Sequence, residues 1–232
     1  MSLPDQAGAM DTLRQTWPPE WREDVGAFRF QGAPGAGKRV NAASALGSPS
    51  DKDVADGEAV FAQNEQTPLF VVQPDQKDFD TVLAARGYGV VDPTLLMARA
   101  TRAAPFHSAP PDHEIDALFS HADVGAERRA VMGRVAGESA VLFEGTPAVP
   151  QGVVFVANGQ NGAMFHALYV APGARRAGVG RALVTGCLGW AHAARAPWLA
   201  LAVVEANAPA IALYTSLGFH PVGRYWYRTR RG

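Results

Sequence analysis

The sequence predicts an α/β (α+β) fold, because short β-type runs alternate with helical patterns along most of its 232 residues. The clearest strand is residues 164–170, an apolar run with β-branched and aromatic side chains that Pro172 and Gly173 end. Just downstream, apolar residues recur at helical spacing over 183–191. A strand, a short turn and a helix therefore follow one another at the centre of the second half.

Composition limits the class of protein. The hydrophobic content is 47%, enough for one large domain or two small ones. The net charge of −1 gives no global attraction to nucleic acid or to an anionic membrane. The single cysteine, Cys187, excludes an internal disulfide, and no apolar run reaches membrane-spanning length, so we expect a soluble cytoplasmic protein. The six histidines have no zinc-type spacing with cysteine or carboxylate partners, and no metal is expected.

The first part of the chain contains a regular series of short elements. In order, the patterns predict a helix from 11 to 15 stopped by prolines, a strand at 27–30, a strand or loop at 40–47, a helix at 51–66, a strand at 69–72, a helix at 78–86 and a strand near 94–98. A stretch rich in proline and alanine follows, and we interpret 105–111 as a linker.

The pattern then restarts. In order, it predicts helices at 112–119 and 125–135, strands at 140–144, 153–157 and 164–170, a long helix at 178–196, a strand at 198–204, a helix at 209–217 and a terminal strand at 225–228. Pro209 at the first turn of the penultimate element and Gly218 just past its end show the proline and glycine asymmetry of helices.

A glycine-rich stretch over 32–38 imitates a phosphate loop. It matches that pattern through Lys38, but the next residue is Arg39, where the motif needs Ser or Thr to bind magnesium. No buried strand precedes it and no helix follows it, so we interpret it as the connection of a hairpin. A nucleotide-binding enzyme remains the rival hypothesis, and it predicts ATP binding that depends on Lys38.

The turn before the long helix has the chemistry of an anion site. Gly178 and Gly180 lack a Cβ, so that an anion can approach the main chain where a helix start has unpaired N–H groups. Arg175, Arg176 and Arg181 raise the local positive potential. Two glycines alone can also be explained by packing of the helix against its sheet.

Two linked motifs carry a family resemblance. Val170-x-Pro172 is followed by Arg175-x-x-Gly178-x-Gly180-Arg181, and Asn207-x-x-Ala210-x-x-Leu213-Tyr214-x-x-x-Gly218-Phe219 comes about 25 residues later. Together they resemble the acyl-CoA signature of the GNAT N-acetyltransferase superfamily. The resemblance implies a mixed, mostly antiparallel sheet flanked by helices, and transfer of an acetyl group from acetyl-CoA to a primary amine of a small molecule or peptide.

The resemblance also implies a set of cofactor-binding residues. The strand before the glycines would bind the pantetheine arm as an added strand, and the turn would hold the pyrophosphate. The implied residues are Leu168, Tyr169, Val170, Arg175, Arg176, Ala177, Gly178, Val179, Gly180, Arg181, Ala182, Asn207 and Tyr214. Asn207 is also an ordinary helix N-cap, and both roles are compatible.

Tyr214 is the implied general acid for the departing thiolate. It shares a helix face with Ala210, Leu213 and Leu217, so that core packing is the alternative. Glu205, at the end of a strand, is the candidate base or water-holding residue, and His166 is a second candidate. A backbone N–H of the strand at 164–170 would serve as the oxyanion donor.

The two halves share an order of elements. Residues 83–88 follow the pattern of 214–219, with Leu83 at the place of Tyr214, and no Gly-x-Gly follows the strand at 40–47. We therefore expect a degenerate GNAT-like domain over 1–104, the linker, and a catalytic GNAT domain over 112–232. A catalytically inactive CoA-binding sensor or scaffold is the alternative function. The acceptor amine and the oligomeric state cannot be predicted from the sequence.

Overall fold

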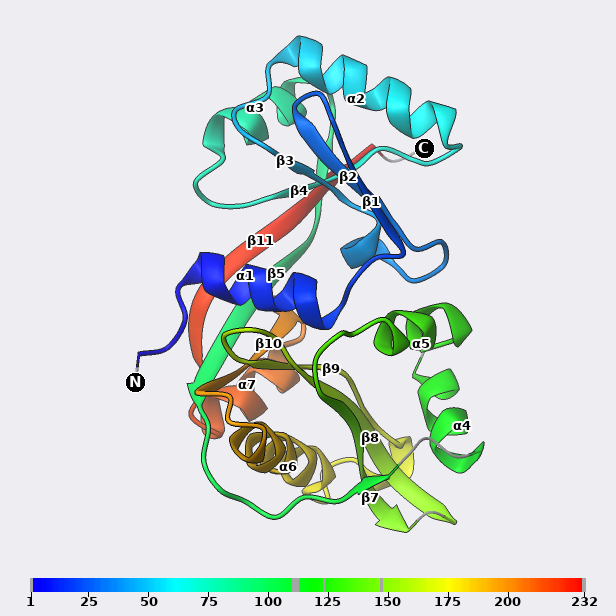
Figure 1. Ribbon diagram of the computed structural model, residues 1–232, viewed down its shortest axis with the longest axis vertical. Coiled ribbons are helices and arrows are strands. Elements are labelled where there is room, and N and C mark those ends of the chain that lie inside the picture. Colours follow the sequence, from blue (N-terminus) through cyan, green and yellow to red (C-terminus); the bar gives the residue numbers. More distant parts are fainter. Residues whose placement is uncertain (1, 110–112, 123, 147, 231–232) are drawn as a thin grey trace. The chain divides into compact units, whose positions relative to one another are not determined.

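The computed structural model describes residues 2–109, 113–122, 124–146 and 148–230. The chain forms two compact units, shown in Figure 1, and neither is a continuous segment. The larger unit contains residues 2–18, 96–203 and 207–223, and the smaller unit contains 19–95, 204–206 and 224–230. These units differ from a division at 105–111, because the N-terminal helix belongs to the larger unit and the last strand enters the smaller one.

The larger unit holds most of the elements predicted for the second half. Its helices are α1 (Gln6–Thr16), α4 (His113–His121), α5 (Ala126–Gly133), α6 (Val179–Ala193) and α7 (Ala208–Ser216), with a 3-10 turn η2 (Pro172–Ala174). Its strands are β6 (Ser108–Ala109), β7 (Ser139–Thr146), β8 (Val149–Asn158), β9 (Ala163–Val170), β10 (Trp198–Val204) and the end of β5 (Gly89–Ala100).

The strands of the larger unit form a mixed sheet in the order β5-β10-β9-β8-β7-β6. The β6–β7, β7–β8 and β8–β9 pairs are antiparallel, whereas β9 and β10 are parallel. The prediction of a mostly antiparallel sheet flanked by helices is confirmed.

Helices cover both faces of this sheet, as the alternation along β8 shows. A Cβ on Gly152 would meet Val179 and Leu183 of α6. Phe155, three residues on and therefore on the other face, packs against Trp17 just after α1, with ring centroids 6.4 Å apart. Helix α6 thus lies on one face and α1 on the other.

The smaller unit has its own sheet and core. Its elements are β1 (Trp21–Val25), β2 (Phe28–Gly32), the 3-10 turn η1 (Lys38–Val40), β3 (Ala43–Ala45), α2 (Asp51–Gln63), β4 (Leu69–Val72), α3 (Lys77–Ala85) and the end of β11 (His220–Thr229). The strand order is β1-β2-β3-β4-β11, with β3 and β4 parallel and the other pairs antiparallel. The core is mainly aromatic and contains Phe28, Phe30, Phe61, Phe70, Phe79 and Tyr88.

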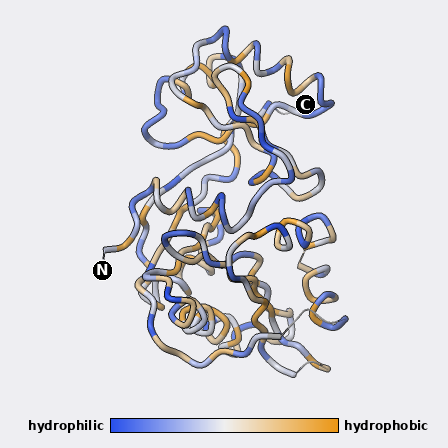
Figure 2. The backbone as a smooth tube through the Cα atoms, in the orientation of Figure 1, coloured by the Kyte–Doolittle hydropathy of each residue, from blue (hydrophilic) through white to orange (hydrophobic). Residues whose placement is uncertain are grey.

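Two sequence predictions need correction, and a third is confirmed. Strand β1 was missed because four of its five side chains are exposed, which removes the alternation that indicates a strand, and Figure 2 colours it mostly hydrophilic. The last strand is longer than the predicted 225–228. The glycine-rich loop connects antiparallel β2 and β3, as expected of a hairpin, and Lys38 pairs with Asp92 at 2.9 Å.

The segment before β6 packs on α6. A Cβ on Gly189 of α6 would lie 2.1 Å from the Ala104 carbonyl oxygen, and one on Gly186 would lie 3.5 Å from Phe106. The two glycines therefore let an extended segment lie directly on α6, and Ser108 continues it into β6. Residues 110–112, which include the predicted end of the linker and the predicted start of the catalytic domain, lie outside the described residues.

Candidate active site

Strands β9 and β10 separate soon after they begin. Their parallel pairing joins only Ala163 to Leu199 and Met164 to Ala200. On its other side, β9 stays paired with β8 as far as Val170. The β10 side of residues 168–170 is therefore an open edge, as expected if this strand binds an extended arm through its main chain.

A β-bulge lies within the open part of β9. The pairing of His166 with Phe155 and of Tyr169 with Val153 leaves two residues of β9 opposite one of β8. Ala167, in the bulge, has φ 53°, a left-handed conformation that is strained for a residue with a Cβ. Such a bulge redirects the main-chain groups next to it, and sequence patterns gave no signal for it.

The N-terminus of α6 is open to an anion. Gly178 is its N-cap with φ 90°, and no side chain caps the helix. The first helical bond runs from the Ala182 N–H to the Gly178 carbonyl, so the N–H groups of 179–181 have no acceptor within the helix. A Cβ at 178 would meet no atom within 4 Å, which means that there is free space above the main chain.

The three arginines of this turn do not act as one group. The Arg175 Nε donates to the Val170 carbonyl at 3.2 Å, which holds the turn against the end of β9. Arg176 is exposed with φ 65°. Arg181 donates to the Ser216 Oγ at 2.9 Å, and so links the start of α6 to the end of α7.

Gly180 brings the three predicted segments together. A Cβ at this position would lie 3.3 Å from Leu213 of α7 and 3.6 Å from Val170 of β9. The absence of a side chain therefore lets the glycine turn, the open strand and the helix of Tyr214 meet at one place.

Tyr214 is buried, with 7% of its surface exposed. Its ring packs edge-on against Phe165 at 5.7 Å and near Phe219 at 6.2 Å. Burial, with a smaller contribution from Cys187, raises the pKa of the Tyr214 phenol to about 12, so the hydroxyl keeps its proton at neutral pH. No residue in the described part of the chain forms a hydrogen bond with this hydroxyl.

Asn207 caps α7. Its Oδ1 accepts from the Ala210 N–H at 3.2 Å, so the capping interpretation is correct for the oxygen, while this bond leaves the amide nitrogen available.

The two candidate bases have different surroundings. Glu205 accepts two bonds from Arg224, at 2.6 and 3.2 Å, which occupy both carboxylate oxygens. His166 is buried on the face opposite Phe165, stacks on Trp17 at 4.9 Å, and has its Nε2 2.9 Å from the Thr16 Oγ1. Because the Thr16 hydroxyl donates to a carbonyl of its own helix, it accepts from His166, which assigns the proton to Nε2.

A cavity of about 490 Å³ lies between α4, α5 and the sheet of the larger unit. Phe119, Met132 and Phe155 make it largely apolar, and Asp116 and Arg129, paired at 3.4 Å, supply charge. Phe155 also faces the His166 ring, at 6.4 Å, so the cavity is on the His166 side of the sheet.

Two classes of site are not found. The described residues contain no group of three or more His, Cys, Asp or Glu side chains that could hold a metal ion. Among the helices in the described ranges, none combines the length and apolar character needed to cross a membrane.

A comparison with protein families shows the family of this chain. The acetyltransferase (GNAT) family model matches residues 102–219, which include the glycine turn, Asn207 and Tyr214. The chain belongs to the GNAT acetyltransferase family. Membership implies acyl transfer, and the family uses acetyl-CoA as the donor. A search of curated proteins found no match.

Solved structures of GNAT proteins share the fold at low sequence identity. A GCN5-related N-acetyltransferase from Kribbella flavida is 14% identical with a TM-score of 0.75, over 97% of this chain and 94% of that one. A tandem GNAT protein from the clavulanic acid biosynthesis pathway is 15% identical with a TM-score of 0.62, over 94% and 85%. A GCN5-related N-acetyltransferase from Sphaerobacter thermophilus is 15% identical with a TM-score of 0.62, over 78% and 68%.

The residues of this chain fit acetyl-CoA. The N–H groups of α6 without an acceptor and the glycines without a Cβ suit a pyrophosphate, and the free edge of β9 suits the pantetheine arm. Sequence reasoning found all these segments, but it missed the bulge at Ala167 and the contacts by which Val170, Gly180 and Leu213 bring them together.

Proposed function

We propose that this protein is an acetyl-CoA-dependent N-acetyltransferase that acts on a primary amine of a small molecule or peptide by direct attack. The observation that carries the proposal is the meeting of three features at Gly180: the uncapped start of α6, the free edge of β9 and the helix of Tyr214. Acetyl-CoA, when bound, supplies an activated acetyl group and a thiol leaving group.

The residues of the chain would bind, orient and move protons. The N–H groups at 179–181, together with Arg176, would hold the pyrophosphate, and residues 168–170 and Asn207 would hold the arm. A main-chain N–H at the bulge of Ala167 is the donor that we propose for developing negative charge on the acetyl oxygen. Tyr214, protonated at neutral pH, would hold the proton for the departing sulfur at its Oη.

The incoming amine must lose a proton before it attacks. Glu205 remains the proposed base or water-holding residue, although its carboxylate is paired with Arg224. His166 is the second candidate, because an imidazole can accept a proton near neutral pH and its ring faces Phe155, which lines the cavity. We propose the cavity between α4 and α5 as the place of the acceptor's apolar part.

We also propose that the smaller unit is a degenerate copy of the GNAT fold without a cofactor site. The support is local: β3 and β4 pair in parallel over only two residues, as β9 and β10 do, and α3 ends at Gly87 as α7 ends at Gly218. The tandem architecture named for one structural neighbour agrees with this proposal.

The test is a screen of CoA release with spermidine, free lysine and a peptide with a free α-amino group, followed by Tyr214→Phe. We expect the variant to lower kcat by roughly 100-fold or more while acetyl-CoA affinity stays within about twofold, because the hydroxyl acts as acid and the ring keeps its packing. The alternative, an inactive CoA-binding sensor, predicts acetyl-CoA binding without turnover in the wild type and no change in Tyr214→Phe.

A further inference from the structure

The last helix of the larger unit ends in a cap that includes Tyr214 itself. The Phe219 N–H donates to the Tyr214 carbonyl at 3.0 Å, and the Gly218 N–H donates to the Thr215 carbonyl at 2.9 Å. With Gly218 at φ 81°, this is a Schellman motif, and the ring contact between Tyr214 and Phe219 is its usual hydrophobic part. The backbone and the ring of Tyr214 are therefore fixed by the end of its helix.

An arginine from strand β5 closes this cap. The Arg99 Nη1 donates to the carbonyl of Leu217, the C-cap of α7. The guanidinium also lies over the glycine, since a Cβ on Gly218 would be 3.5 Å from the Arg99 Cζ. A cation at this position satisfies a terminal carbonyl and opposes the negative end of the helix dipole.

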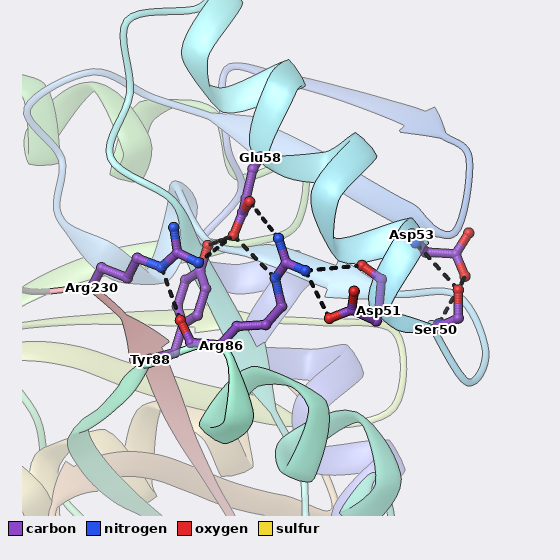
Figure 3. A network of polar contacts seen from close by, with 7 residues as sticks. All are labelled: Ser50, Asp51, Asp53, Glu58, Arg86, Tyr88 and Arg230. Atoms are coloured by element: carbon purple, nitrogen blue, oxygen red, sulfur yellow. Dashed lines mark hydrogen bonds and ion pairs between the residues drawn. The ribbon is translucent and has the colours of Figure 1, made fainter.

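The smaller unit repeats the arrangement on α3. The Tyr88 N–H donates to the Leu83 carbonyl at 3.0 Å, and the Gly87 N–H donates to the Ala84 carbonyl at 3.0 Å. Arg230 donates through Nε to the carbonyl of Arg86, the C-cap of α3, at 3.2 Å. Figure 3 shows Arg230 beside Tyr88 and Arg86.

The two arginines occupy equivalent positions in the sequence. Arg99 is the twelfth residue after Gly87, and Arg230 is the twelfth after Gly218. In the sequence, each arginine follows the glycine of one repeat at the same distance. In the structure, Arg99 caps α7 within the larger unit, and Arg230 caps α3 within the smaller unit. The two helices differ at the residue whose carbonyl accepts from the N–H of the residue after the glycine. This residue is Tyr214 in α7 and Leu83 in α3.

We propose that Arg99 is a positioning residue for the Tyr214 hydroxyl. By holding the Leu217 carbonyl, Arg99 fixes the last turn of α7 and, through the cap at Phe219, the direction of the Tyr214 ring. This inference depends on the proposed role of Tyr214 as general acid. Arg230 provides a matched control, because it makes the same kind of contact on a helix that carries leucine at the corresponding place.

The experiment measures kcat, KM for acetyl-CoA and thermal stability for Arg99→Ala, Arg99→Lys and Arg230→Ala, with the fastest amine of the panel. We expect Arg99→Ala to lower kcat by on the order of tenfold with KM within about twofold, because a shift of a catalytic group by a fraction of an ångström costs rate. Arg99→Lys keeps the charge but loses the planar guanidinium with its several N–H donors. Its kcat should lie between those of the wild type and Arg99→Ala, and this variant replaces Arg99→Ala if the alanine variant does not fold. Arg230→Ala, which also removes the ion pair of Arg230 with Glu58 at 3.1 Å, should lower Tm and leave kcat unchanged.

A double-mutant cycle separates positioning from general damage. In the Tyr214→Phe background, the kcat effect of Arg99→Ala should disappear, because no acid remains to be positioned. The same loss in both backgrounds, or full kcat for Arg99→Ala beside a slow Tyr214→Phe, would overturn the inference and leave the proposed function intact. Full kcat for Tyr214→Phe would overturn the acid role and this inference with it.

Discussion

The two units use one order of elements in two different ways. In each, antiparallel strands lead into a helix, a parallel strand and a second helix closed by glycine: β7, β8, β9, α6, β10 and α7 in the larger unit, and β1, β2, β3, α2, β4 and α3 in the smaller. The parallel pair is only two residues long in both. The backbone plan alone therefore does not distinguish the two units.

The difference lies first at the start of the long helix. Helix α6 begins at Gly178 with no side-chain cap, whereas α2 begins with a capping box in which Ser50 and Asp53 bond to each other's main chain. Asp51 adds a second carboxylate in the first turn. Figure 3 shows these groups at the end of a polar network that also includes Arg86 and Glu58. The site that α6 offers to a phosphate is therefore occupied in α2 by the chain's own oxygens and repels further negative charge.

The second difference lies at the end of the following helix. Within the described residues, the Tyr214 hydroxyl in α7 has no hydrogen-bond partner, while Leu83 in α3 belongs to the aromatic core of the smaller unit. In the smaller unit, the residues at the corresponding positions therefore contribute to the core and to a helix cap. The comparison teaches that the two units differ at a few residues of two helix ends rather than in the order of their elements.

Changing the conformation of the α6 N-cap should weaken acetyl-CoA binding. Gly178→Ala places a Cβ on a residue at φ 90°, a conformation that alanine disfavours. We expect the backbone of the turn to change its conformation and the acetyl-CoA affinity to fall at least tenfold. Gly173→Ala, in the same turn with open space around its Cβ, should bind like the wild type in calorimetric titration. Equal affinities for the two variants would contradict the importance of this conformation.

Removing the main ion pair of α3 should affect stability only. Asp80 accepts bonds from Arg228 and from the Trp226 indole, and Asp80→Asn should lower the free energy of unfolding by roughly 1–3 kcal/mol at pH 7 without changing acetyl-CoA affinity. Urea unfolding of the variant and of Asp78→Asn, an exposed neighbour on α3, provides the measurement and its control.

The same pair predicts a pH dependence. The hydrogen bonds from Arg228 hold the pKa of Asp80 below its usual range, in spite of partial burial. A lowered folded pKa contributes stability above the unfolded value of about 4, and this contribution is lost as pH falls through the folded pKa. The stability difference between wild type and Asp80→Asn should therefore narrow below pH of about 4, and a difference that is constant with pH would exclude this explanation.

Opening the α2 cap should have the smallest effect. Ser50→Ala removes the N-cap and should cost about 1 kcal/mol of stability, whereas Ser48→Ala, exposed and outside the cap, should cost little. Neither variant should create a second acetyl-CoA site, because Asp51 and Asp53 remain. A gain of binding in Ser50→Ala would show that the cap alone closes this helix.

The sequence predicted the elements whose signals are local. Strands β4 and β10 were predicted with the observed bounds, and the turn at 175–182 was recognised because glycine and arginine have direct physical meaning there. Strand β1 could not be recognised, because its exposed side chains give no alternation.

What depends on distant contacts was out of reach. The packing of the stretch near Ala104 on α6 is decided by two glycines that lie more than 80 residues away in the chain. The pairing of Glu205 with Arg224 and the bulge at Ala167 are likewise properties of the folded sheet. The sequence contains one signal for the Arg99 cap, which is the distance of twelve residues from Gly87 to Arg99. This distance becomes informative only by comparison with the equal distance from Gly218 to Arg230.

The central claim is that the chain binds one acetyl-CoA, at the start of α6. Calorimetric titration of acetyl-CoA into the wild type, Gly180→Glu and Gly47→Glu tests it directly, since Gly47 is an exposed glycine close before α2 with open space around it. The account predicts one molecule per chain for the wild type and Gly47→Glu, and affinity weakened by about 100-fold or more in Gly180→Glu, where a carboxylate meets the pyrophosphate. Two molecules per chain, or undiminished binding by Gly180→Glu, would contradict it.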